Sequence, residues 1–261
     1  MDPDRQAELA RLLAGLRRER RTQSGLDAAL VPPDKRTAYR IAERVAELLE
    51  RPVVGWKIAA NMPHMQQALR TDAPIYGRVF APELHATPVE VDFASCCSPI
   101  PESEYMARLG QDLPPRRTPY KLDEVSEAVA SLHPGLELAE CRFIHDQHFP
   151  PLTAILADGA GAGGLVYGPA IEDWRDQDIR GQQVTLRCND RVRRTGTAAS
   201  EIDHPLVSLT WLANELSSTG IGLHAEQMIS TGTLTGMLRP HAGETWVADF
   251  GPFGQVRARY R

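Results

Sequence analysis

A succession of short β-rich runs, separated by Gly and Pro, constrains the fold of this chain more than any other feature. The runs begin after Pro52 and continue to the end of the sequence: VVGWKIAA (53–60), GLELAECRF (135–143), GGLVYG (163–168), QVTLRC (183–188), QMISTG (227–232), TWVADF (245–250) and QVRARY (255–260). They do not alternate regularly with helices, which disfavours a doubly wound parallel sheet. We therefore expect an α+β fold whose sheets are mostly antiparallel and are packed or rolled around a core.

The N-terminal residues have a different, helical pattern. Two helices are predicted, at 5–21 and 34–50, and in the second Tyr39, Ile41 and Val45 recur at helical spacing. Further helices are predicted at 64–69, 122–133 and 204–218. The chain is therefore expected to divide into a small helical N-terminal region, residues 1–51, and a β-rich catalytic domain, residues 52–261.

Charge and composition exclude several classes of partner. The 261 residues are 42% hydrophobic and carry a net charge of −5, which gives no electrostatic footprint for nucleic acid. No apolar run is long enough to span a bilayer, and the charged N-terminus has no signal-peptide core. The four cysteines form no CxxC pair. We expect a cytoplasmic protein that binds neither nucleic acid nor membrane.

Three glutamates are candidate metal ligands. Glu102 and Glu104 belong to an E-x-E pair, and on a strand such residues point to the same side. Two like charges this close need water or a cation between them, and for a bare E-x-E a solvated strand face is the preferred explanation. With Glu137, from the run GLELAECRF, they would form the all-oxygen set that Mg²⁺ or Mn²⁺ prefers.

Lys57 is a candidate catalytic residue because it interrupts an apolar run. In VVGWKIAA it shares a strand face with the small residues Gly55 and Ala59. A lysine there must reach water, pair with a carboxylate or serve a site, since an unpaired buried charge is destabilising. A structural role, with the ammonium extended toward water, remains the alternative.

Two glycine-containing segments are candidate ligand loops. ILADGAGAGGLVYG (155–168) lacks the spacing of a nucleotide-binding motif, but its small residues would let the backbone approach a ligand. STGTLTG (230–236) offers amides and hydroxyls to an anion, although a plain turn explains it as well.

These segments, taken in order, resemble the fumarylacetoacetate hydrolase superfamily, and within it the 2-keto-4-pentenoate hydratase and 4-oxalocrotonate decarboxylase branch. The similarity extends from about residue 35 to the end and includes GWKIAANMPHMQQALRTDAPIYGRVF (55–80) and SPIPESEYMARLGQDLP (98–114). It implies a mixed β-roll with a small helical N-terminal part. It also implies a homo-oligomer that acts on a small 2-oxo acid in aromatic catabolism.

The resemblance also implies roles for individual residues. Glu102, Glu104 and Glu137 would hold Mg²⁺ or Mn²⁺, and Lys57 and Asp158 would be catalytic. The residues expected to contact substrate are Ile75, Arg78, Gly161, Thr231, Gly232 and Thr233. Arg78 would bind a second carboxylate of the substrate, and a structural ion pair is the alternative for it.

Two departures from the pattern bear on the reaction. Ile75 stands where such hydratases often carry an acid, and Gly159 and Gly161 stand beside Asp158 where they often have Asn and Ser. The P-I-Y-G form is closer to the decarboxylases, although the two glycines depart from those as well. We expect a hydratase of an unsaturated 2-oxo acid that works through a metal-stabilised enolate. A 2-oxo-3-hexenedioate decarboxylase, a non-catalytic partner subunit and a C–C hydrolase remain alternatives.

Overall fold

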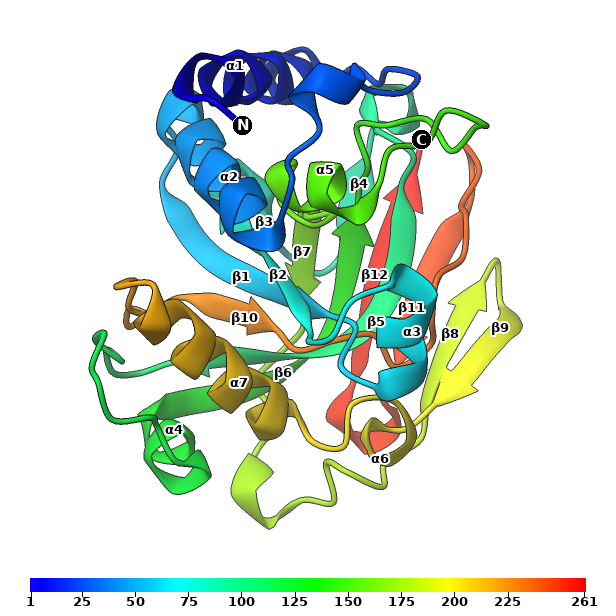
Figure 1. The fold of residues 1–261 in the computed structure, drawn as a ribbon. Helices are drawn as coiled ribbons and strands as arrows, with labels where there is room; N and C mark the ends of the chain where they lie inside the picture. The colour runs from blue at the N-terminus through cyan, green and yellow to red at the C-terminus, as the bar shows by residue number, and fades with distance from the viewer.

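The computed structural model of the protein describes residues 1–261 and consists of two curled β-sheets with helices packed around them (Figure 1). The strands are β1 Val53–Ala59, β2 Ile75–Phe80, β3 Leu84–Ala86, β4 Val89–Val91, β5 Ile100–Leu109, β6 Val129–Ala139, β7 Gly164–Tyr167, β8 Val184–Cys188, β9 Arg191–Gly196, β10 Met228–Ser230, β11 Thr245–Asp249 and β12 Gln255–Tyr260. The helices are α1 Pro3–Glu19, α2 Lys35–Leu49, α3 Pro63–Leu69, α4 Leu122–Ala128, α5 Leu152–Ala157, α6 Ala198–Glu201 and α7 Pro205–Ser218. None of these helices combines the length and the apolar character that crossing a membrane requires.

Most strand pairs are antiparallel. One sheet has seven strands in the order β2-β1-β10-β5-β6-β7-β3, and the other has five in the order β4-β12-β11-β8-β9. The pairs β1–β10, β3–β7 and β4–β12 are parallel, and all other pairs are antiparallel. The expected α+β fold with mostly antiparallel, rolled sheets is therefore confirmed.

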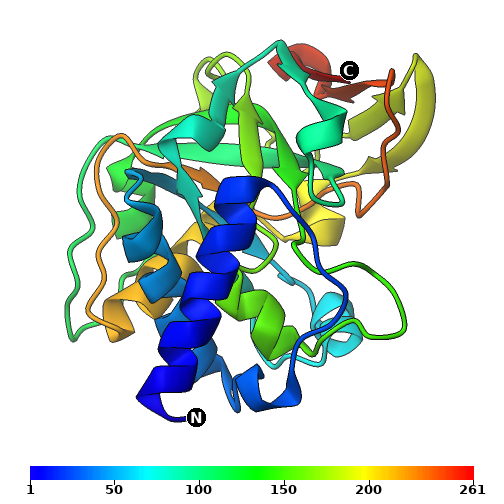
Figure 2. The same cartoon turned by 90° about the horizontal axis from the view of Figure 1, so that it is seen from above.

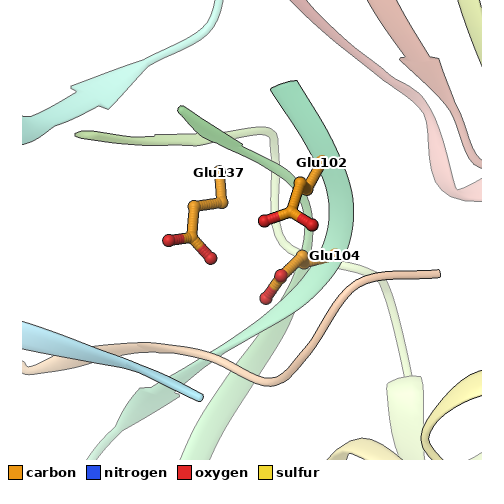
Figure 3. A group of neighbouring side chains, drawn as sticks. All are labelled: Glu102, Glu104 and Glu137. Atoms are coloured by element: carbon orange, nitrogen blue, oxygen red, sulfur yellow. The ribbon is translucent and has the colours of Figure 1, made fainter. Parts of the chain in front are cut away.

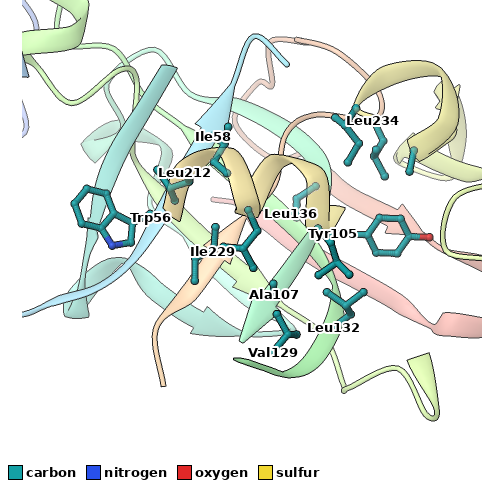
Figure 4. Close-up of a cluster of buried hydrophobic side chains, with 14 of the residues drawn as sticks. Trp56, Ile58, Tyr105, Ala107, Val129, Leu132, Leu136, Leu212, Ile229 and Leu234 are labelled. Carbon is teal, nitrogen blue, oxygen red and sulfur yellow. The ribbon is translucent and has the colours of Figure 1, made fainter. Parts of the chain in front are cut away.

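The main hydrophobic core lies between the two sheets and under α7. Alternate residues of the seven-stranded sheet enter it, such as Trp56 and Ile58 of β1 and Tyr105 of β5 (Figure 4). The five-stranded sheet contributes Trp246, and Leu209 and Leu212 of α7, which confirms the helix predicted at 204–218, are buried here too. Since successive strand residues point to opposite faces, the intervening positions of β1, β5 and β6 face away from this core.

A second buried cluster joins the N-terminal helices to the sheet. Leu9 and Leu13 of α1, together with Ile41 of α2, pack with Ile75 and with residues of α5. Figure 2 shows α1 lying across α2 on the outside of the molecule. The two predicted helices are thus confirmed, with ends within two residues of those expected. The division at residue 51 stays a prediction, because this cluster contains residues from both sides of it.

The helix predicted at 122–133 is wrong in its second half. Helix α4 ends at Ala128, and β6 begins at the next residue. Val129 and Leu132 fit the helical repeat that begins at Leu122, so the local pattern favours a longer helix. Pairing of β6 along the whole of β5 overrides that preference, because it buries the alternating residues that start at Leu132.

Candidate active site

The three glutamates predicted as metal ligands meet on one face of the seven-stranded sheet. Glu102 and Glu104 lie on β5, and Glu137 lies on β6 directly opposite Glu102. One carboxylate oxygen from each residue lies within 4.8 Å of the others, and the three carboxylates turn toward a common space (Figure 3). The residues are only 6%, 1% and 1% exposed, respectively. The solvated strand face considered above is therefore excluded.

The last residue of β10 and the segment after it hold the Glu104 carboxylate. Its Oε2 atom accepts hydrogen bonds from the Ser230 hydroxyl at 2.6 Å and from the Gly232 amide at 2.7 Å. Both carboxylate oxygens of Glu137 are buried without a hydrogen-bond donor. Buried polar atoms normally have a partner, and these two oxygens are therefore available as ligand atoms.

Burial makes the charged form of this cluster unfavourable. Burial first, and then the charge of Glu137, raises the pKa of Glu102 to about 8. Burial raises the pKa of Glu104 well above its usual range, and the charges of Glu137 and Glu102 raise it further. Burial likewise raises the pKa of Glu137. Like charges directly opposite each other on paired strands are destabilising. A divalent cation would relieve this repulsion with the oxygen ligands that it prefers.

Lys57 lies at the edge of the same cluster. Its Nζ atom lies 3.7 Å from Glu137 Oε1, and the residue is 4% exposed. Strand β1 directs Lys57 away from the core that its neighbours Trp56 and Ile58 enter. The structure thus brings Lys57 and the three glutamates together, as the sequence predicted.

The glycine-rich loop lies against Lys57. A Cβ atom on Gly161 would lie 3.8 Å from Lys57 Nζ, an ordinary contact distance, so the loop backbone comes close to the ammonium. On β2, Gly77 is the register partner of Lys57, and a Cβ atom there would come within 2.0 Å of Gly159 O. Only glycine at position 77 allows the loop to come this close. Ile75 lies on the same face of β2 as Gly77, is 4% exposed, and packs in the buried cluster that joins the N-terminal helices to the sheet.

Asp158 is part of a buried ion-pair network rather than of the glutamate cluster. Its Oδ2 accepts from Arg142 Nε at 2.7 Å and its Oδ1 from Arg17 Nε at 3.3 Å. Both arginines also donate to the backbone oxygens of Asp158 and Ala162. These contacts favour a structural role, in which Asp158 anchors the loop that carries Gly161. A catalytic role for Asp158 stays a prediction that no contact here supports.

Arg78 is not brought to the glutamates. It is the register partner of Trp56, so its side chain lies on the opposite face of the sheet from Lys57. Its guanidinium carbon lies 4.9 Å from the Trp56 ring centroid, and its Nη2 lies 3.9 Å from Glu43 Oε1. The alternative of a structural ion pair therefore describes Arg78 better than contact with substrate.

The loop at 231–233 has more specific contacts than the sequence indicates. The Thr231 hydroxyl donates to Tyr105 O at 2.8 Å, and the residue is fully buried. A hydrogen bond from the Thr233 hydroxyl to the Glu102 carboxylate opposes the rise in the pKa of Glu102 that burial causes. The Gly232 amide donates to Glu104 rather than remaining free for an anion. The sequence analysis did not identify Ser230 as a hydrogen-bond donor to a predicted metal ligand, although Ser230 begins the segment STGTLTG and precedes Thr231.

Replacing Glu102 with Gln (E102Q) should remove metal stabilisation without weakening the metal-free protein. At a metal concentration 100 times the Kd, Mg²⁺ should raise the Tm of the wild type by about 5–10 °C. We expect no such rise in E102Q, whose Tm in chelator should be at least that of the wild type because one buried like charge is gone. Thermal unfolding with and without Mg²⁺ measures both effects. E127Q, at an exposed glutamate, should keep the full rise; an equal rise in E102Q would exclude Glu102 as a ligand.

Comparison with known proteins places this geometry in context. No family model matches the chain. The chain is 28% identical over 208 residues to a 2-keto-4-pentenoate hydratase of Burkholderia vietnamiensis, covering 80% of this chain and 78% of the relative. It is 27% identical to a 2-keto-4-pentenoate hydratase of Paraburkholderia phymatum, covering 99% and 98%. The sequence similarity therefore extends over the whole chain.

Solved structures show the same fold. The 4-oxalocrotonate decarboxylase of Pseudomonas putida G7, complexed with magnesium and adipate, superposes with a TM-score of 0.91 at 20% identity, covering 100% of this chain and 99% of that one. A putative fumarylacetoacetate hydrolase family protein of Yersinia pestis gives a TM-score of 0.57 at 16% identity, covering 82% and 95%. The chain therefore has the fold of 4-oxalocrotonate decarboxylase and of a fumarylacetoacetate hydrolase family structure, and its sequence similarity to 2-keto-4-pentenoate hydratases confirms the resemblance stated above.

Proposed function

We propose that the protein is a divalent-metal-dependent hydratase that acts on an unsaturated 2-oxo acid or its 2-hydroxydienoate form. The observation that supports this most strongly is the buried cluster of Glu102, Glu104 and Glu137 with Lys57 at its edge. A purely structural subunit gains nothing from three converging buried carboxylates, since such a cluster is destabilising without a ligand. The sequence similarity to hydratases supports the same reaction class.

The donor set fits Mg²⁺ or Mn²⁺. Three carboxylates supply only oxygen ligands, and the unpartnered oxygens of Glu137 are the kind of atoms that a hard cation satisfies. Glu102, Glu104 and Glu137 would hold the ion. When bound, it would supply positive charge for the carboxylate and 2-oxo oxygens of the substrate and for the negative charge that develops there.

The protein's own groups would then position and protonate the substrate. Lys57 is a buried ammonium at the edge of the glutamate cluster, with no side chain at Gly161 beside it, so it would contact a substrate carboxylate or move a proton to and from the dienol carbon chain. A hydratase protonates the far end of the dienol and adds water to the resulting enone. Burial of the site limits access of bulk water and strengthens these charge interactions.

Decarboxylation of a 2-oxo-3-hexenedioate is the second candidate, and Ile75 is the observation that favours it. On β2 this residue occupies the strand face of Lys57, where an acid could help to activate water, and instead it packs in an apolar cluster. A decarboxylase needs no activated water, because departure of CO₂ leaves its electrons in the same enolate. The two reactions share the metal ligands and differ in the groups at the far end of the substrate.

A paired assay tests the proposal. Freshly generated 2-hydroxypenta-2,4-dienoate and 2-oxohex-3-enedioate are each followed by ultraviolet absorbance and CO₂ release, with Mg²⁺ and with chelator. We expect chelator-sensitive loss of the dienoate without CO₂. Release of CO₂ from the dicarboxylate would instead favour the decarboxylase. No reaction with either compound by a protein that still binds Mg²⁺ would reject this substrate class, and absence of metal binding would favour the non-catalytic subunit.

We further propose that the protein acts in the cytoplasm as a homo-oligomer and serves aromatic catabolism. The relatives' reactions and the four free cysteines support this setting. The division into a helical region, 1–51, and a catalytic region, 52–261, is also proposed, and the change from helices to mostly strands after residue 51 supports it.

A further inference from the structure

We propose that Asn61 is a positioning residue that orients the Glu104 carboxylate through the peptide group between Thr231 and Gly232. The inference rests on the proposed function, because it takes Glu104 as a metal ligand. Asn61 does not touch the glutamates itself. It acts through a single peptide unit, whose two polar atoms connect Asn61 on one side to Glu104 on the other.

Asn61 contacts the peptide group between Thr231 and Gly232 directly. Its side-chain amide donates to Thr231 O at 3.2 Å. The N–H of the same peptide unit belongs to Gly232, and it donates to Glu104 Oε2 at 2.7 Å. A hydrogen bond accepted by a peptide oxygen polarises the N–H of that peptide and strengthens the bond that it donates. Asn61 therefore both aims and strengthens the hydrogen bond to Glu104.

The second step is the close packing of Asn61 on Gly232. A Cβ atom at Gly232 would lie 2.2 Å from Asn61 Oδ1, so the amide lies against the glycine backbone. Gly232 has a φ of +115°, a conformation that side-chain-bearing residues rarely adopt. A glycine is free to leave this conformation, and contact with the Asn61 side chain restricts it.

The third step is the anchoring of Asn61. Its amide also donates to the Ser208 hydroxyl at 2.5 Å, and Ser208 is a buried residue of α7. The carbonyl oxygens of Ala60 and Asn61 accept from Gln66 of α3, at 3.0 and 3.4 Å. Helix α7 thus holds the side chain of Asn61, and α3 holds its backbone. Its orientation is set by the framework of the protein and not by the glutamate cluster.

The two hydrogen bonds to Glu104 determine which of its carboxylate oxygens is available to a metal ion. Both donors to Glu104, Ser230 and Gly232, end on Oε2. This leaves Oε1 for a cation and holds the carboxylate plane in one orientation. Partners that orient a metal ligand in this way typically change metal affinity by about 10–100-fold when they are removed.

The test measures Mn²⁺ affinity by electron paramagnetic resonance on the full-length protein, so it does not depend on turnover. Asn61→Ala removes both amide contacts, and Ser208→Ala removes only the anchor. Asn214→Ala is the matched control. This asparagine of α7 is also half-buried, and its side chain makes two hydrogen bonds with the Tyr120 backbone, at 2.6 and 3.0 Å. Thermal unfolding in chelator reports the stability of each variant.

We expect Asn61→Ala to weaken Mn²⁺ binding by about 10–100-fold. Ser208→Ala should weaken it less, and Asn214→Ala should leave it unchanged at a similar loss of thermal stability. Wild-type affinity in Asn61→Ala would overturn the inference, as would equal losses of affinity in Asn61→Ala and Asn214→Ala. If Asn61→Ala does not fold, wild-type affinity in Ser208→Ala overturns it. Failure of the wild type to bind Mn²⁺ would instead reject the proposed metal site.

Discussion

Replacing Asp158 with Asn (D158N) should lower the free energy of unfolding by about 3–5 kcal/mol, measured by urea denaturation in chelator. The Asp158 side chain is fully buried, and the side chains of Arg17 and Arg142 are only 5% and 2% exposed. Burial, and then the neighbouring Arg142 cation, lowers the pKa of Arg17, so these two cations already disfavour each other. Removing the carboxylate would leave two buried positive charges whose nearest counter-charge is the partly exposed Glu140, with its Oε2 3.6 Å from Arg142 Nη1.

An exposed ion pair provides the control for this prediction. Arg44 and Glu47 of α2 lie 2.7 Å apart, and both side chains are more than half exposed. Exposed pairs of this kind contribute under about 1 kcal/mol, so E47Q should be close to the wild type in stability. A D158N variant with wild-type stability but greatly reduced turnover would contradict the structural role. It would restore the catalytic role that the resemblance implied.

The position of the glutamate cluster was predictable from strand periodicity. Glu102 and Glu104 are two residues apart, and residues flanking them, such as Tyr105, enter the core. The same alternation places Lys57 and Glu137 opposite their apolar neighbours. Local patterns could therefore assign each side chain to a face. They could not show that the three strands are close together, because register between distant strands depends on tertiary pairing.

The residues that support the cluster were not predictable from local sequence. The partners Arg17 and Asp158 are 141 residues apart, and Asn61 and Thr231 are 170 apart. No periodic pattern links such positions, and each residue taken alone has a common surface explanation. The same limit applies to Arg78, whose register with Trp56 placed it on the opposite face from the glutamates. The sheet face that a side chain occupies can be predicted from its neighbours in sequence. A hydrogen-bond network between distant residues can be recognised only once the complete fold is known.

Replacing Lys57 with Met (K57M) should lower kcat by about 10²–10⁴-fold, the usual contribution of a positioned proton-transfer group. Methionine has a similar length and no charge, so it fills the same space beside Gly161 without carrying a proton. The Lys57 ammonium lies 3.7 Å from Glu137 Oε1 and has the same sign of charge as a bound metal. Its removal should therefore leave Mn²⁺ affinity at or above that of the wild type, as measured by electron paramagnetic resonance.

Two further variants separate proton transfer from simple charge. K57R keeps a positive charge, but a guanidinium does not release its proton near neutral pH. If Lys57 transfers a proton, K57R should be nearly as slow as K57M, whereas a role limited to attracting the substrate carboxylate should leave much of the activity and mainly change KM. K121M, at an exposed lysine, controls for loss of a lysine elsewhere. Wild-type turnover in K57M would remove Lys57 from the mechanism, and weakened Mn²⁺ binding would show that it instead supports the glutamate cluster.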